Sequence, residues 1–235
     1  MDRYQLMDMI RRLIIVGAGG AGCEALWVVQ RMNAQTLTDK LLVMGWVDDN
    51  PIRKGESVEG SPILGTGEQV CRELGGQGIL FHCAVGSNRH RQRLAELFER
   101  AGFEAIALID PSAIIAETAR IGPGSYIGPL SIVAPHATVG RHVLINTHVG
   151  VGHHAVVADY AQLCPGVRVN GGCKIDKGAF LGSNSVVHPG QTIGEGASIG
   201  ANSFVIRSVK PRYTMLGVPA RIVSRPAENG PDAQS

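Results

Sequence analysis

The sequence predicts two units in series: an α/β unit with a small parallel sheet, and an all-β solenoid built from six-residue repeats. A branched aliphatic residue recurs at every sixth position through much of the second half. A strand, glycine-turn and helix pattern opens the first hundred residues. Aromatic residues make up only 5% of the chain and glycine is frequent, at 31 residues. Such a composition is typical of a repetitive architecture filled by small side chains.

The six-residue repeat runs without a slip from Ile109 to Val205. A mostly small residue follows each aliphatic four positions later, and glycine often comes directly after it. A period of six suits a short strand and a tight corner, with the aliphatic side chain pointing inward. The repeated residues are Ile109, Ile115, Ile121, Ile127, Val133, Val139, Ile145, Val151, Val157, Leu163, Val169, Ile175, Leu181, Val187, Ile193, Ile199 and Val205.

The stretch RRLIIVGAGGAGCEALWVVQRM predicts a strand over residues 13–16, a glycine turn and a helix with one apolar face. Two further strands are expected in LLVMGWVDD and GILFHCAVG, and a helix is expected after them, capped by Ser87 or Asn88. The order βαβ…βα favours a small parallel sheet.

The glycines of the turn, Gly17, Gly19 and Gly22, match G-x-G-x-x-G, which lets a backbone approach a phosphate at a helix N-terminus. A tight turn that binds nothing is one reading. Binding of NAD is another, since Asp48 lies where a ribose-binding acid would lie. The unit is short for two mononucleotide halves, so the nucleotide of a nucleotide sugar fits better.

The combination of IVGAGGAG, WVDDNP and AVGSNRHRQRL with the hexads and a final GVPAR resembles one family over residues 12–224. This is the family of nucleotide-amino-sugar N-acetyltransferases and sialic acid O-acetyltransferases. The resemblance implies a Rossmann-like domain over residues 1–105 and a left-handed parallel β-helix over residues 106–224, in which positions 18 apart stack. Residues 225–235 are expected to be a disordered tail.

The resemblance also assigns binding residues. The N-terminal domain would hold a nucleotide-linked amino sugar, and acetyl-CoA would lie between neighbouring β-helices of a homotrimer. The residues implied near the sugar nucleotide are Gly19, Gly20, Asp48, Asp49, Asn88 and Arg89, with Asn146 and Gln162 near the sugar. The residues implied near acetyl-CoA are Gly171, Gly182, Ser183, Gly200, Ala201, Gly217 and Pro219.

The catalytic histidine of the family falls on His153. Gly171 lies 18 residues further on, so a base and the backbone amide of Gly171 or Gly172 would meet within one strand spacing, as acyl transfer requires. His154 stands where the family usually has an acid, and it would orient His153 or relay a proton. It also stacks over His136, which by itself is typical of mere surface.

Four other positions depart from the family or carry no chemistry. Gln162 replaces a second histidine of the family, and Ala21 begins the triplet where the family often has His-Gly-Lys. Cys164 and Cys173 are expected in or near the core rather than as nucleophiles, because the amine would attack the thioester directly.

We therefore expect an acetyl-CoA-dependent N-acetyltransferase that acts on a nucleotide-linked 4-amino-4,6-dideoxy sugar, with a histidine as general base. One alternative is an O-acetyltransferase that acts on sialic acid or another glycan unit. Two others are a non-catalytic sugar-nucleotide-binding trimer and an NAD-binding protein with a β-helix appended.

Charge and composition exclude other classes. The net charge is +2 without a long basic run, which argues against nucleic acid or an anionic membrane as partner. No apolar run reaches roughly 18 residues, so no membrane span is expected. The N-terminus carries acids and lacks the apolar region of a signal peptide. Five cysteines without metal-ligand spacing favour reduced thiols in the cytoplasm and no metal.

Overall fold

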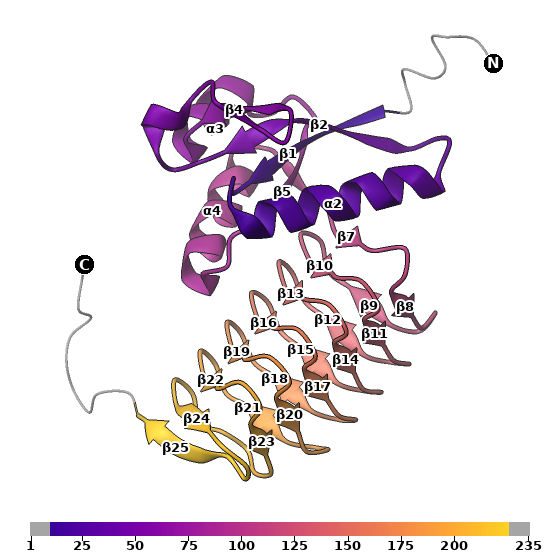
Figure 1. Cartoon of the computed structure of the whole chain (residues 1–235), viewed down its shortest axis with the longest axis vertical. Helices are drawn as coiled ribbons and strands as arrows, with labels where there is room; N and C mark the ends of the chain where they lie inside the picture. Colours follow the sequence, from indigo (N-terminus) through magenta and orange to yellow (C-terminus); the bar gives the residue numbers. More distant parts are fainter. Residues whose placement is uncertain (1–9, 226–235) are drawn as a thin grey trace.

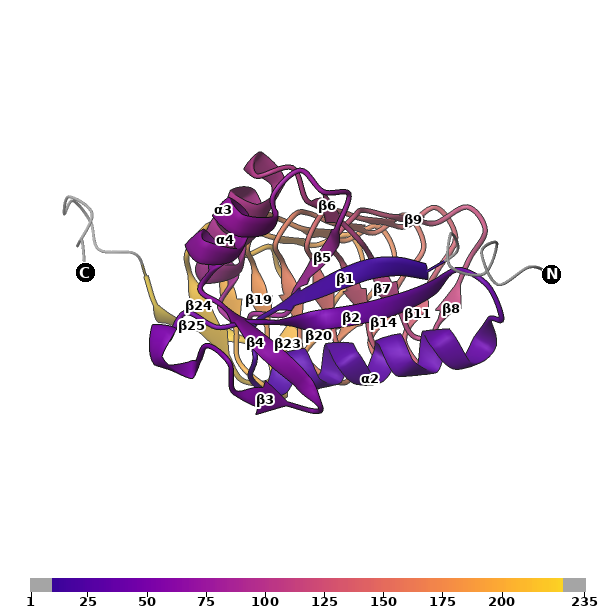
Figure 2. The same cartoon turned by 90° about the horizontal axis from the view of Figure 1, so that it is seen from above.

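The structure, a computed structural model, describes residues 10–225 and contains two packed units (Figure 1). The expected disordered tail lies outside these residues except for Arg225, as do the first nine residues. The N-terminal unit is a twisted sheet with helices on both faces. The C-terminal unit is a solenoid of short strands, and the N-terminal unit lies over its first coils (Figures 1 and 2).

The N-terminal sheet has the strand order β3-β4-β2-β1-β5-β6, and all of its pairs are parallel except β3–β4. The expected order βαβ…βα is confirmed, while the β3–β4 hairpin and helix α3 are additions. The elements are β1 (Ile10–Val16), α2 (Gly20–Gln35), β2 (Lys40–Val47), the 3₁₀ helix η1 (Pro51–Arg53), β3 (Ser57–Val58), β4 (Ser61–Gly65), α3 (Gly67–Leu74), β5 (Leu80–Cys83), α4 (Asn88–Arg100) and β6 (Glu104–Ala105).

Strand β1 shows why the first apolar run has no alternation with polar residues. Leu13 and Ile15 pack in the cluster that contains α2, whereas Ile14 and Val16 pack with α3 and α4 on the other face. All four side chains are fully buried. A parallel sheet covered on both faces needs such a continuous apolar strand. The N-cap of α4 is Ser87, whose hydroxyl accepts a hydrogen bond from the His90 amide.

The solenoid consists of two-residue strands that recur every six residues and form three sheets (Figure 1). Strands 18 residues apart pair in parallel, as in Tyr126 opposite Leu144, which confirms the expected stacking. We name the sheets by their order in each coil.

The first sheet contains β7 (Leu108–Ile109), β10 (Tyr126–Ile127), β13 (Leu144–Ile145), β16 (Gln162–Leu163), β19 (Phe180–Leu181), β22 (Ser198–Ile199), β24 (Thr214–Leu216) and the antiparallel β25 (Arg221–Ser224). The second sheet contains β8 (Ile114–Ile115), β11 (Ile132–Val133), β14 (Gly150–Val151), β17 (Arg168–Val169), β20 (Val186–Val187) and β23 (Phe204–Val205). The third sheet contains β9 (Arg120–Ile121), β12 (Thr138–Val139), β15 (Val156–Val157), β18 (Lys174–Ile175) and β21 (Thr192–Ile193).

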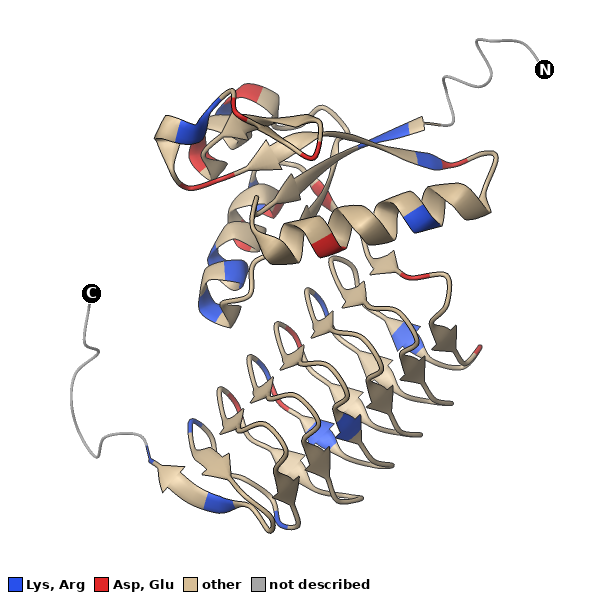
Figure 3. Ribbon diagram, in the orientation of Figure 1, with Lys and Arg blue, Asp and Glu red and all other residues tan. Residues whose placement is uncertain are grey.

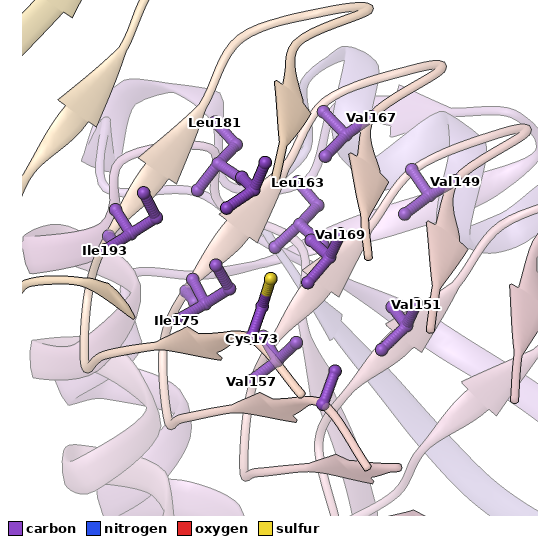
Figure 4. Packing of buried hydrophobic residues seen from close by; sticks show 14 of the residues in the cluster. Val149, Val151, Val157, Leu163, Val167, Val169, Cys173, Ile175, Leu181 and Ile193 are labelled. Carbon is purple, nitrogen blue, oxygen red and sulfur yellow. The ribbon is translucent and has the colours of Figure 1, made fainter. Parts of the chain in front are cut away.

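The aliphatic residues of the repeat stack as ladders along the inside of the solenoid (Figure 4). Those from Ile127 to Val205 are essentially inaccessible to solvent. Small residues such as Ala155 and Cys173 fill the corners between ladders, so the core needs no aromatic side chain. The inward aliphatic side chains of each coil are therefore buried only by packing against the neighbouring coils, as in solenoids generally.

The third residue of most corners has a positive φ. Glycine occupies this position in several coils, and in others the residue is a histidine: His136, His142, His148 and His154 have φ between 52° and 59°. Asparagine, aspartate and histidine are the non-glycine residues most often found in this left-handed conformation. Four of the eight histidines thus stand at a conformationally special corner position, and His153 does not.

Polar contacts join the two units. Arg31 of α2 forms an ion pair of 2.6 Å with Asp110 of the first coil, whose side chain is fully buried. Arg91 of α4 is also fully buried and donates hydrogen bonds to the backbone carbonyls of His142 and Tyr160. These contacts lie beside the first sheet, so the N-terminal unit is fixed against that side of the solenoid.

Candidate active site

A hollow of about 330 Å³ opens beside the glycine turn of the N-terminal unit. It is lined by residues 16–21, the end of β2 and the loop after β5, and it includes Gly19, Gly20, Asp48 and Asp49. Gly19 is the N-cap of α2 and has no side chain to cap the first turn. The free amides of this turn therefore face the hollow, where a helix N-terminus favours an anion.

Glycine is required at Gly17, the first position of the motif. Its φ is +114°, and a Cβ there would lie 2.7 Å from the Ala84 carbonyl oxygen. Gly19 and Gly20 differ, because a Cβ at either would meet nothing within 4 Å. Both glycines are open towards the hollow, so a phosphate group of a ligand has room to approach their backbone.

The two aspartates that follow β2 already have hydrogen-bond or ion-pair partners. The Asp48 carboxylate accepts hydrogen bonds of 2.5 Å from Arg53 and 2.9 Å from the Asn50 amide. The Asp49 carboxylate lies 2.7 Å from His90 Nε2. His90 lines the same hollow and was not expected from the sequence. It stands one turn into α4, and only the folding of α4 against β2 brings it to Asp49.

The expectations for Asn88 and Arg89 differ from the structure, since neither residue lines this hollow. The Asn88 amide donates a hydrogen bond of 2.9 Å to the Gly178 carbonyl of the solenoid, and its oxygen accepts one from Arg91. Asn88 therefore ties the two units together. Arg89, the second residue of α4, is exposed, and Figure 3 shows that Lys and Arg side chains recur along this helix.

A smaller hollow of about 60 Å³ lies where the N-terminal unit meets the first sheet of the solenoid. Asn146 and Gln162 line it from the solenoid, and His82 and Glu24 line it from the N-terminal unit. Ala21 belongs to the walls of both hollows, so the two adjoin at the glycine turn.

His153 lies at the corner between the second and third sheets. Its Nδ1 is 3.1 Å from Nδ1 of His154, and the two rings meet edge to face at 83°. The His154 ring lies 5.0 Å from that of His136 in the coil before. Both His153 and His154 are exposed.

The His153 ring lies against the backbone of Gly171. A Cβ at Gly171 would be 2.5 Å from His153 Nε2, so no other residue fits beneath the ring without a shift. The Gly171 amide has no hydrogen-bond partner within residues 10–225. The Gly172 amide differs, because it donates to the His153 carbonyl at 2.9 Å. Of the two amides expected to stabilise an oxyanion, only that of Gly171 is free to do so.

Neither Cys173, at this corner, nor Cys164, at the corner between the first and second sheets, is a reactive thiol. Burial raises the pKa of the Cys173 thiol and of the Cys164 thiol above the ordinary value. A thiol is a nucleophile only as the thiolate, so neither is reactive near neutral pH.

Of the seven residues expected near acetyl-CoA, Gly171 lies at the His153 corner, whereas the other six gather elsewhere, at the corner between the first and second sheets. Gly182 and Gly200 stack there, and a Cβ at Gly182 would lie 2.6 Å from the Ala201 amide nitrogen. The GVPA segment folds back onto this corner, with the Gly217 amide bonded to the Ser203 hydroxyl at 3.0 Å. The Val218–Pro219 peptide is cis. Ser183 lies beside Gly182 in the same corner, so these six residues form one group.

Two family models match the chain. The PglD N-terminal domain matches residues 12–98, and the bacterial transferase hexapeptide model of six repeats matches residues 172–207. No match was found among curated proteins.

Solved structures match over both units. A mutant of perosamine N-acetyltransferase from Caulobacter crescentus, in complex with CoA and GDP-perosamine, is 28% identical, with a TM-score of 0.83 over 91% of this chain and 97% of the other. The acetyltransferase domain of PglB from Neisseria gonorrhoeae, in complex with acetyl coenzyme A, is 27% identical, with a TM-score of 0.81 over 91% and 99%. WeeI from Acinetobacter baumannii is 25% identical, with a TM-score of 0.78 over 91% and 100%.

In both of its units the chain thus resembles hexapeptide acyltransferases that carry a PglD-type N-terminal domain. The expected fold class, a Rossmann-like α/β unit followed by a left-handed parallel β-helix, is confirmed. Within residues 10–225, no helix is long and apolar enough to cross a membrane. The same residues contain no group of three or more His, Cys, Asp or Glu that could hold a metal ion.

One chain does not bring all candidate residues together. The nucleotide hollow and the small hollow lie against the first sheet. The His153 corner is the one corner of the coil that does not adjoin that sheet. A shallow groove of about 290 Å³ on the second sheet reaches it and includes Gly152 and Asn170, the neighbours of His153 and Gly171.

Proposed function

We propose that this protein transfers the acetyl group of acetyl-CoA to the amino group of a nucleotide-linked 4-amino-4,6-dideoxy sugar. The observation that carries the proposal is the match of both units to perosamine N-acetyltransferase in complex with CoA and GDP-perosamine. The open glycine turn supports it independently, because a free sugar would leave that turn unused.

The proposed nucleotide site is the 330 Å³ hollow. The diphosphate would lie on the free amides at the start of α2, next to Gly19 and Gly20. The ribose or base would lie towards Asp49 and His90. Asp48 would act indirectly, because its carboxylate is already held by Arg53 and shapes the end of β2.

The proposed base is His153. A sugar ammonium is not a nucleophile until it loses a proton, and a neutral imidazole is able to accept it. The amine then attacks the thioester carbon, the tetrahedral oxyanion takes a hydrogen bond from the Gly171 amide, and CoA leaves as the thiol. His154, 3.1 Å from His153, would orient the ring.

A homotrimer completes the proposed site. The His153 corner of one chain lies away from the nucleotide hollow of the same chain, so the amine would have to reach His153 of a neighbouring copy. Apolar residues beside the groove on the second sheet support such contacts: Ile114, Leu130 and Ile132 are 65%, 55% and 47% exposed. Acetyl-CoA would lie between copies, along the corner of Gly182 and Gly200 and under the GVPA segment.

The test is a thiol-release assay with acetyl-CoA. Matched amino and hydroxy sugar nucleotides and free sialic acid serve as acceptors. We expect the amino sugar nucleotide to react fastest, because a deprotonated amine needs less activation than a hydroxyl and the Gly152–His153–His154 corner lacks a carboxylate. Faster reaction of the hydroxy sugar nucleotide or of sialic acid would favour O-acetylation instead.

The remaining alternatives give other outcomes in a thermal-shift panel. A non-catalytic trimer would be stabilised by a sugar nucleotide without releasing thiol, and an NAD-binding protein would be stabilised by NAD. Five free cysteines without a disulfide fit the proposed cytoplasmic location, where thiols stay reduced.

A further inference from the structure

The small hollow between the two units contains buried polar atoms that have no partner. His82 of β5 is fully buried, and its Nε2 has no hydrogen-bond partner among the described residues. The Oε1 atom of Gln162, on β16, is buried and unpaired in the same way. Both residues line the hollow. Buried polar groups are normally paired, so two unpaired atoms at one cavity indicate a missing ligand or water.

The contact of the other ring nitrogen, Nδ1, determines which tautomer His82 adopts. Nδ1 lies 3.2 Å from the Ile106 carbonyl oxygen, which only accepts, so Nδ1 carries the proton. Burial lowers the pKa of His82 to about 4, and the ring is therefore neutral near pH 7. Nε2 is then an unprotonated hydrogen-bond acceptor, so its missing partner has to be a hydrogen-bond donor.

Two further groups of the hollow accept hydrogen bonds, while the side chains of Asn146 and Tyr126, which also line it, can donate. Gln162 offers its amide oxygen, which is an acceptor. Glu24 offers a carboxylate that forms no ion pair within residues 10–225. No lysine or arginine lines the hollow. A phosphate is therefore excluded from it, whereas a ligand rich in O–H donors is favoured.

Size and position narrow the ligand further. The hollow measures about 60 Å³, against about 330 Å³ for the nucleotide hollow, so it suits the edge of a sugar rather than a nucleotide. It shares Ala21, Ala84 and Gly86 with the nucleotide hollow. A sugar linked to a diphosphate at the glycine turn would thus present its hydroxyl-bearing edge to His82 and Gln162.

We propose that this hollow is a subsite for hydroxyl groups of the substrate's sugar ring, and that His82 and Gln162 are specificity-determining residues that accept hydrogen bonds from them. The proposal rests on the proposed function, because it assumes that a nucleotide-linked sugar occupies the larger hollow. It places recognition of the sugar in the N-terminal unit and the first sheet of one chain, apart from the His153 corner.

The experiment compares binding of a nucleotide sugar with binding of the corresponding nucleoside diphosphate by titration calorimetry. In His82→Leu and in Gln162→Leu we expect the affinity for the nucleotide sugar to fall about 5- to 10-fold, the effect of one neutral hydrogen bond. The affinity for the nucleoside diphosphate should not change. His82→Gln keeps an acceptor near the position of Nε2 and should recover most of the loss. Gln77→Leu, on an exposed loop, is the matched control.

A deoxy analogue of the sugar nucleotide locates the hydroxyl. It should bind wild type as weakly as His82→Leu binds the parent compound, and His82→Leu should bind both equally. If both leucine variants keep the wild-type ratio of sugar-nucleotide to diphosphate affinity, the hollow holds water only and the proposal is wrong. Binding is measured without acetyl-CoA. A failure of acetyl transfer would therefore overturn the proposed function, while the binding data would still test whether the small hollow accepts sugar hydroxyl groups.

Discussion

Arg91 Nη2 lies 2.7 Å from the backbone carbonyl oxygen of Tyr160, and this bond joins helix α4 to the third coil of the solenoid. The same guanidinium donates to the carbonyls of His142 at 3.0 Å and Val85 at 2.8 Å. Val85 belongs to the loop that lines the nucleotide hollow. One buried side chain thus holds the nucleotide loop and the solenoid in a fixed relation, without any carboxylate partner.

We expect Arg91→Met to destabilise the protein by about 3 kcal/mol or more, because it leaves several buried carbonyls unpaired. The KM for the nucleotide sugar should rise more than the KM for acetyl-CoA, since Val85 and Gly86 lose their support. Denaturant unfolding and steady-state kinetics measure the two effects. Arg100→Met is the control, because Arg100 is exposed on the same helix. An equal loss of stability and an equal rise in KM in the two variants would contradict the role of Arg91.

The assembly prediction concerns the second sheet. If the protein forms the proposed trimer, Ile132→Glu should turn it into monomers, since a charge would be buried in the proposed contact. Acetyl transfer should be lost, while the nucleoside diphosphate should still bind to each chain. Light scattering and calorimetry measure these outcomes. Leu37→Glu is the control, because Leu37 is 88% exposed in a loop of the N-terminal unit. A wild-type chain that is monomeric at micromolar concentration would overturn the shared site.

The sequence predicted the solenoid well because its repeat is local and strict. A branched aliphatic at every sixth position specifies the inward side chain, and the resemblance to hexapeptide acyltransferases implied the stacking of residues 18 apart, as for His153 over Gly171. The parallel N-terminal sheet was predicted for a similar reason, since the glycine turn and the buried strand LIIV are local signals.

The contacts between units could not be predicted in this way. His90 meets Asp49, and Asn88 meets Gly178, only after α4 packs on both the sheet and the solenoid. No periodicity encodes such contacts. Nor does the repeat show which side of the coil the N-terminal unit covers, and so the separation of His153 from the nucleotide hollow is visible only in three dimensions.

His153→Asn should lower kcat by about 10²- to 10⁴-fold, the usual range for loss of a general base. Affinity for acetyl-CoA should remain, because His153 is exposed at a corner and supports no core contact. His154→Asn should cost about 10-fold, because an orienting partner matters less than the base. Asparagine suits the positive φ of 58° at this position, so the backbone should not move. Stopped-assay kinetics of the two variants suffice, and a larger effect at His154 would reverse the assignment.

Gly171→Ala tests the contact between ring and backbone. The new methyl group would lie 2.5 Å from His153 Nε2, so the imidazole has to move. We expect kcat to fall by about 10²-fold, because a displacement of about 1 Å at a reacting group costs that much. The melting temperature should change little, since the ring is exposed. Gly178→Ala is not a suitable control, because the φ of Gly178 is positive. Gly86→Ala is not suitable either: a Cβ at Gly86 would meet nothing within 4 Å, but Gly86 lines the nucleotide hollow. Glu195→Gly therefore serves as the control, because Glu195 is exposed and holds the same position as Gly171 at a corner between the third and first sheets, away from the proposed sites.

The last prediction concerns pH and His82. Burial lowers the pKa of His82 to about 4 from an ordinary value of 6.5. Between these values the unfolded chain binds a proton that the folded chain does not, so the stabilising contribution is complete above pH 6.5 and is lost as the pH falls towards 4. A shift of this size corresponds to about 3 kcal/mol. Glu99 adds to the loss in the same direction: burial alone would raise the pKa of its carboxyl, but hydrogen bonds from His142 and Arg141 lower it overall.

Urea unfolding of wild type and His82→Leu at pH 7 and pH 4.5 separates the two contributions. The carboxylates act equally in both proteins, so wild type should lose about 2–3 kcal/mol more than His82→Leu over this range. Parallel pH dependence in the two proteins would mean that the pKa of His82 is the same in the folded and unfolded chains, which would contradict its burial without a partner at Nε2.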